Sequence, residues 1–247
     1  MIPKGFITAL RLLTIIPVIG KEAEKRYCAI PYFLIVGLII SIIHFLGAEI
    51  LYHYLPGLTV FAGLLLTIIN YTASGALHLD GLADTADAFS TVQTREKTLF
   101  ILKDPHLGTF GAGAMFIVIL WRIITYQQLF EQRMMLWVVF ALMFSRIMQG
   151  LFLLLIPYAR GKEGKAFGFK GPFAFTAILI MQSVLLFAAG WLIFDYRIVL
   201  SVVIGIASIL PICLVYHKRI GGITGDGIGA ATEVFEIVFL TVVVAFV

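Results

Sequence analysis

Charged residues are scarce in this 247-residue sequence: they make up 13% of it, against 61% hydrophobic residues. A soluble domain of this length cannot bury so much apolar surface, so the composition excludes an ordinary soluble protein and indicates a polytopic membrane protein. Two cysteines, Cys28 and Cys213, exclude a framework of several disulfides. The sequence also lacks a basic patch interleaved with aromatic residues, so we expect no nucleic-acid partner.

Long apolar stretches account for most of the chain. A helix needs about 20 apolar residues to cross the bilayer. Seven segments meet this length: residues 30–51, 58–77, 110–129, 134–156, 173–194, 198–216 and 228–247. A shorter stretch, FITALRLLTIIPV at residues 6–18, contains Arg11 and Pro17, and we expect it to form an interfacial or re-entrant helix. The sequence therefore predicts an all-α fold, with residues 1–247 forming one membrane-embedded domain.

Lysine and arginine are distributed unevenly between the two sides of this predicted bundle. Of the 18 such residues, 14 fall in the N-terminal segment and in alternate connections, while the opposite connections contain only Arg133 and Arg197. Because positive residues concentrate on the cytoplasmic side, we expect a multi-pass protein of the cell inner membrane with its N-terminus inside. The long polar connections, and any active site that they form, would then face the cytoplasm.

One of these connections contains a row of carboxylates, in the motif HLDGLADTADAF at residues 78–89. Asp80, Asp84 and Asp87 are spaced i, i+4, i+7 and so fall on one stripe of a helix. Such carboxylates repel one another unless a cation neutralises them, and Mg²⁺ is typically held by carboxylates together with substrate phosphates. His78 lies off this stripe and is expected to contact substrate rather than metal. The simpler alternative is a solvated acidic helix end, which we disfavour because the whole chain has only 14 acidic residues.

A second acidic motif, GGITGDGIGAATEVFE, occupies residues 221–236. Its acids fall near one helical face, and those within the last span are costly to bury unless they have a function. Its glycines permit close backbone approach and leave amides free for a phosphate group. We therefore predict further metal ligands at Asp226, Glu233 and Glu236, and substrate contacts at Gly222, Thr224 and Gly225. The alternative is a glycine-rich turn that only precedes a helix.

Two further connections contain candidate substrate-binding groups. LKDPHLGTFGA, residues 102–112, contains Lys103 and Asp104, and PYARGKEGKAF, residues 157–167, contains Arg160 and Lys162. Guanidinium and ammonium groups bind phosphate oxygens, although the positive-inside bias alone also accounts for these basic residues. Arg146 is different because it falls within a predicted span and needs an anionic partner, which the acidic motifs can supply.

Taken in chain order, the five motifs quoted above resemble those of the cobalamin synthase family of adenosylcobinamide-GDP ribazoletransferases. The resemblance covers most of the chain, with departures at Pro105–His106, where the family usually has Ser-Arg, and at TIIP in the first motif. It implies that α-ribazole, or its 5′-phosphate, is joined to adenosylcobinamide-GDP, which releases GMP and forms adenosylcobalamin or its 5′-phosphate. It also implies a Mg²⁺-assisted reaction at a phosphate, with His78, Asp80, Asp84 and Asp87 as the catalytic group.

Two alternatives have different chemistry. A CDP-alcohol phosphotransferase also uses aspartates on membrane helices, but its pattern requires Ala-Arg after Asp-Gly, where this chain has Ala83–Asp84. A divalent-cation transporter places acids near the membrane midplane on broken helices, whereas the densest acids here are expected at one face. The sequence predicts no oligomeric state.

Overall fold

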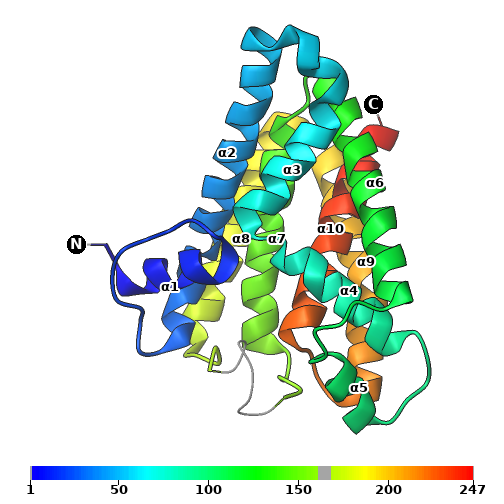
Figure 1. Ribbon diagram of the computed structural model, residues 1–247. Coiled ribbons are helices and arrows are strands. Elements are labelled where there is room, and N and C mark those ends of the chain that lie inside the picture. The colour runs from blue at the N-terminus through cyan, green and yellow to red at the C-terminus, as the bar shows by residue number, and fades with distance from the viewer. Residues whose placement is uncertain (1, 161–167, 247) are drawn as a thin grey trace.

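The computed structural model describes residues 2–160 and 168–246, and within these ranges it contains helices and no strand (Figure 1). This confirms the predicted all-α fold. In chain order the elements are α1 (Lys4–Leu13), the 3₁₀ helix η1 (Arg26–Tyr32), α2 (Phe33–Tyr54), the 3₁₀ helix η2 (Pro56–Phe61), α3 (Ala62–Ser74), α4 (Leu77–Phe89), α5 (Arg95–Ile101), α6 (Thr109–Glu131), α7 (Leu136–Leu155), α8 (Phe173–Phe194), α9 (Arg197–Ile220) and α10 (Gly225–Ala245).

Seven helical segments in the described part of the chain are long and apolar enough to cross a membrane, as predicted. They are α2 with η1, α3 with η2, and α6 to α10. The second ends at Ser74 rather than at residue 77, because Gly75 (φ 67°) and Ala76 (φ 53°) are both left-handed and interrupt the helix. A left-handed backbone costs a residue with a side chain about 1–2 kcal/mol, so the surrounding packing must hold Ala76 in place.

The short helices gather at one end of the bundle. Figure 1 shows α1, α4 and α5 in the half of the molecule away from the C-terminus, with α5 at its far end. The ten residues of α1 span only about 15 Å, too little to cross the bilayer. Its apolar face, with Ile7, Leu10 and Leu13, is buried against the bundle, while Arg11 is exposed. This amphipathic pattern agrees with the interfacial helix expected from the sequence.

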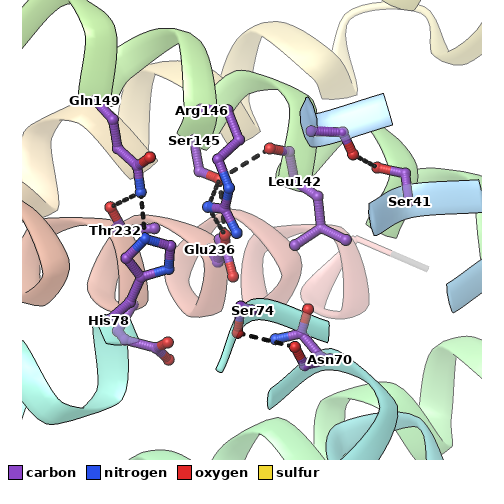
Figure 2. Close-up of polar contacts among 12 residues, drawn as sticks. Ser41, Asn70, Ser74, His78, Leu142, Ser145, Arg146, Gln149, Thr232 and Glu236 are labelled. Carbon is purple, nitrogen blue, oxygen red and sulfur yellow. Dashed lines mark hydrogen bonds and ion pairs between the residues drawn. The ribbon is translucent and has the colours of Figure 1, made fainter. Parts of the chain in front are cut away.

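A buried network of charges joins α6, α7 and α10 within the spans. Arg122 of α6 contacts Glu233 at 2.7 Å and Glu236 at 3.1 Å, both on α10. Arg146 of α7 contacts Glu236 at 3.1 Å, and Ser145 donates a hydrogen bond to the same carboxylate at 2.7 Å (Figure 2). Two arginines thus balance two glutamates, which makes burial of all four groups tolerable. The expected acidic partner of Arg146 is therefore Glu236.

The network predicts the effect of removing Arg146. Arg146→Ala leaves Glu236 with one of its two arginines, and we expect a loss of about 3–5 kcal/mol of stability, the cost of breaking a buried pair. Adding Glu236→Gln should recover part of this loss, because Arg122 and Glu233 then remain as a balanced pair. Thermal unfolding and folded yield in detergent measure both effects. An Arg146→Ala protein that is as stable as the wild type but inactive would instead assign Arg146 to substrate binding.

The uneven distribution of charge predicts which end of the bundle faces the cytoplasm. Val92 follows α4 and is 89% exposed, while Tyr54 ends α2 at the opposite end and is 78% exposed. In a protein whose native cysteines have been replaced by serine, Val92→Cys should react with an impermeant thiol reagent only from the cytoplasmic side. Tyr54→Cys is the matched control and should react only from outside. The reverse pattern would contradict the proposed orientation.

Candidate active site

A cavity of about 260 Å³ lies between α1, α4, α7 and α10, where the polar motifs meet. Three of the predicted stretches contribute to its polar lining: His78 and Asp80 on α4, Arg160 after α7, and Gly225 and Asp226 at the start of α10. Gln149 of α7 also lines it. Segments about 150 residues apart in the chain therefore contribute to one space. This convergence, rather than any single motif, makes the cavity the candidate active site.

Glycines allow α4 and α10 to approach closely enough to form it. A side-chain Cβ at Gly81 would lie 2.7 Å from the carbonyl oxygen of Asp226, closer than real Cβ atoms come. One at Gly229 would lie 3.1 Å from the Cα atom of His78. Gly81 thus packs against the backbone of Asp226, and Gly229 packs against the backbone of His78. A side chain at either glycine would push the two helices apart.

The aspartates of α4 share their surroundings with Asp226. Burial, and then the nearby charges of Asp80 and Asp226, raise the pKa of Asp84 to about 7, although Arg160 opposes the shift. The raised pKa of Asp84 agrees with the mutual repulsion predicted for these carboxylates. In the described ranges, no three His, Cys, Asp or Glu side chains already converge at metal-binding distances. A metal ion here would need ligands from a substrate as well as from the protein.

His78 is buried and held by a polar pair on neighbouring helices (Figure 2). The Gln149 amide nitrogen lies 2.8 Å from His78 Nε2 and donates to Thr232 Oγ1, also at 2.8 Å. Thr232 donates its own proton to the carbonyl oxygen of Ile228, so it can only accept from Gln149. The remaining amide proton of Gln149 then points to His78 Nε2, which accepts it, and the His78 proton resides on Nδ1. Burial, and then the charges of Arg146 and Arg122, hold the pKa of His78 well below its usual value, so the ring is neutral.

The loop with Arg160 is attached directly to the start of α10. Tyr158 and Ile223 form an isolated bridge, and Gly222 packs so closely on the carbonyl oxygen of Pro157 that no side chain would fit. Arg160 Nη2 then lies 2.8 Å from the Asp226 carboxylate and lines the cavity.

Of the remaining predicted residues of the second motif, two have structural contacts and one lines the cavity. Thr224 caps α10 by accepting a hydrogen bond from the amide of Gly227, and it donates to Asp226 at 3.2 Å. Gly225 has open space where a Cβ would lie, so its backbone faces the cavity. Gly222 instead serves the contact between the two loops.

Asp87 has structural contacts that its predicted role as a metal ligand did not include. Its two carboxylate oxygens accept hydrogen bonds from the amides of Gly108 and Gly111, each at 2.8 Å. These amides belong to the N-terminal end of α6, where a negative charge is favourable. A Cβ at either glycine would collide with the carboxylate. The structure therefore uses Asp87 to connect α4 to α6, and this contact explains the glycines of the third motif.

Other predicted site residues lie elsewhere. Glu233 and Glu236 follow Asp226 by about 10 and 15 Å along α10 and are occupied by Arg122 and Arg146. The expectation that they join the aspartates at a metal is therefore not supported by their positions, because a buried carboxylate between arginines is already neutralised.

Lys103 and Asp104 are not among the residues that line the cavity, and Asp104 contacts the ring of exposed His106 at 2.5 Å. Lys162 lies outside the described residues. Sequence reasoning missed Gln149, Thr232 and Arg122. The available signal was that Arg122 and Gln149 are polar residues within apolar spans.

The contact of Asp87 predicts a local effect of its removal. Asp87→Ala should release the start of α6, since hydrogen bonds to a charged group contribute about 1.5–3 kcal/mol each. We expect faster hydrogen–deuterium exchange over residues 102–112, measured by mass spectrometry, together with a lower unfolding temperature. Asp80→Ala, on the same helix, should leave this exchange unchanged. Equal exchange in both variants would contradict a structural role for Asp87.

Known proteins match the chain over nearly its whole length. The family model described as cobalamin-5-phosphate synthase matches residues 5–244. An adenosylcobinamide-GDP ribazoletransferase of Chlorobium phaeobacteroides is 34% identical, covering 95% of this chain and 94% of that protein. One from Acinetobacter baumannii strain ACICU is 35% identical, covering 98% and 97%. No solved structure matches. These similarities favour neither a CDP-alcohol phosphotransferase nor a cation transporter, and the chain belongs to the cobalamin-5-phosphate synthase family.

Proposed function

We propose that this protein is an adenosylcobinamide-GDP ribazoletransferase that completes cobalamin synthesis, and that the cavity between α4 and α10 is its active site. The relatives that match over more than nine-tenths of the chain carry that name. The observation that supports the location is the convergence of Asp80, Arg160 and Asp226 on one cavity. The expected position at the cytoplasmic face of the inner membrane gives this cavity access to soluble substrates.

In the proposed reaction, a ribose hydroxyl of α-ribazole, or of its 5′-phosphate, attacks the cobinamide-side phosphorus of adenosylcobinamide-GDP. A new bond forms between the ribose oxygen and that phosphorus, and the bond from the phosphorus to the oxygen of GMP breaks. The hydroxyl proton goes to a base, and GMP leaves with the bonding electrons. Chemistry of this kind depends on positioning and on neutralisation of charge, rather than on a covalent enzyme intermediate.

The residues around the cavity suit these tasks. Arg160 is oriented by Asp226 and by the carbonyl oxygen of Leu102, at 2.8 and 2.9 Å, and its guanidinium can bind phosphate oxygens. His78 has its only lone pair occupied by the amide of Gln149, so it donates a hydrogen bond from Nδ1 instead of taking the proton. The proton of the attacking hydroxyl therefore goes to a carboxylate of α4, of which Asp80 lines the cavity.

Mg²⁺ fits the same group of acids. The charges of Asp80 and Asp226 both act on Asp84 and raise its pKa. Asp226 already contacts Arg160, a group that can itself bind substrate phosphate, whereas the partners of Asp87, Glu233 and Glu236 are structural. We propose that Asp80, Asp84 and Asp226 hold the ion, since Mg²⁺ is often bound by one or two carboxylates together with substrate phosphates. Bound Mg²⁺ would neutralise charge on the diphosphate. Lys103, Asp104 and Lys162 stay as proposed contacts for the outer parts of the substrates.

The test is release of GMP from adenosylcobinamide-GDP and α-ribazole as Mg²⁺ is increased. Asp80→Asn keeps the size of the side chain but removes its charge, and we expect catalysis to fall at least ~100-fold, the scale of losing a preorganised electrostatic group. Adding Asp84→Asn to Asp80→Asn should lower catalysis by much less than a further ~100-fold, because the effects of groups that act together are not additive. Both variants should need more Mg²⁺. The matched control is Glu96→Gln, an exposed acid on α5, which should change neither quantity. Near-normal turnover and an unchanged Mg²⁺ requirement in Asp80→Asn would reject the proposed site.

A further inference from the structure

The cavity has a second wall that the proposed chemistry does not use. Apart from Leu77 of α4 and Ile228 of α10, the apolar lining comes from other elements and consists of five residues: Leu12 and Leu13 of α1, Phe33 at the start of α2, Leu153 of α7, and Phe169. None of these side chains has a hydrogen-bonding group. Figure 1 shows α1 on the other side of α7 from α10, so the apolar and polar residues approach the cavity from different directions. We call these five residues the apolar wall.

The size of the cavity limits what the apolar wall can contact. At about 260 Å³ it is slightly smaller than the ~300–1,000 Å³ typical of sites for drug-sized ligands. A nucleoside is of this size, whereas a corrinoid ring is far larger and must stay outside. The group that reaches the apolar wall is therefore a small part of one substrate.

The two substrates of the proposed reaction offer two flat bases of different polarity. Guanine has hydrogen-bond donors and acceptors around its edge, and burying them without partners costs free energy. The benzimidazole base of α-ribazole has two methyl groups and a single free acceptor nitrogen, so nearly all of its surface is apolar. Leucine side chains and the edge-to-face rings of Phe33 and Phe169, whose centroids lie 6.5 Å apart, suit the second base and not the first.

We infer that the apolar wall binds the benzimidazole base of α-ribazole, and that α1 thereby selects the lower-ligand base. This inference rests on the proposed function, because it names which part of which substrate occupies the same cavity. With the base against the apolar wall, its ribose is directed to the polar wall, where Asp80 and Arg160 lie. The N-terminal helix then has a role in specificity in addition to its contact with the membrane interface.

Leu13 and Leu10 provide a matched pair for the test. Both are leucines of α1 and both are buried, with 4% and 5% exposure, but only Leu13 lines the cavity. The steady-state rate of GMP release is measured with α-ribazole and with its analogue that lacks the two ring methyls, for wild type, Leu13→Ala and Leu10→Ala. We expect Leu13→Ala to raise the KM for α-ribazole about 10-fold, the lower end of the effect of one missing methylene in an apolar pocket.

The expected signature is a coupling between side chain and methyl groups. Wild type and Leu10→Ala should prefer α-ribazole to the unmethylated analogue by the same ratio of kcat/KM. Leu13→Ala should reduce that ratio several-fold, because the ring methyls contribute less to binding when the side chain that they contact is removed. The KM for adenosylcobinamide-GDP should not change. Should Leu13→Ala fail to fold, Leu153→Ala with Leu154→Ala as its control gives the same comparison on α7, since only Leu153 lines the cavity.

Other outcomes separate the two proposals. A wild-type protein that releases no GMP from the two substrates rejects the proposed function, and the inference with it. Normal release by wild type, with equal methyl preference in Leu13→Ala and Leu10→Ala, rejects the inference alone. A rise in the KM for adenosylcobinamide-GDP, without a change for α-ribazole, would place guanine at the apolar wall and also overturn it.

Discussion

The site depends on the close packing of α4 against α10. Gly81 and Gly229 remove the side chains that would otherwise separate the two backbones. As a result, the carboxylates of α4 share one space with Asp226, and the repulsion among them becomes part of the site's chemistry. Arg160 enters the same space only because its loop is joined to the start of α10. Without this contact the motifs would remain separate polar ends of apolar helices.

The buried charges support this arrangement from within the membrane. Arg122 and Arg146 hold Glu233 and Glu236, and thereby connect α6 and α7 to α10. One turn further along α7, Gln149 reaches Thr232 on α10 and His78 on α4 (Figure 2). One face of α7 therefore has two roles: Arg146 neutralises Glu236, and Gln149 orients His78. A lipid environment makes such contacts specific, since a polar group without a partner is costly there.

The sequence predicted the helical spans and the placement of the acidic motifs on helices, because apolar length and 3.6-residue spacing are local properties. It also predicted that Arg146 has an acidic partner, since a buried guanidinium requires one. It did not separate the acids by their roles. Asp87 has the same spacing as Asp80 and Asp84, and only the position of α6 shows that its oxygens accept the amides of Gly108 and Gly111. Likewise, Arg122 is an isolated charge in the sequence, and its pairing with Glu233 depends on how α6 packs against α10.

The left-handed residues Gly75 and Ala76 join α3 to α4 without an intervening loop. The direction in which each face of α4 points is therefore fixed by the orientation of α3. One inserted or deleted residue in α3 would turn the acidic stripe by about 100°, the angle per residue of an α-helix, and would direct it away from α10. The segment from Ala62 to Phe89 consequently has almost no freedom in length, although only its second half contains polar chemistry. Natural variation in length should thus be confined to the loops outside this segment.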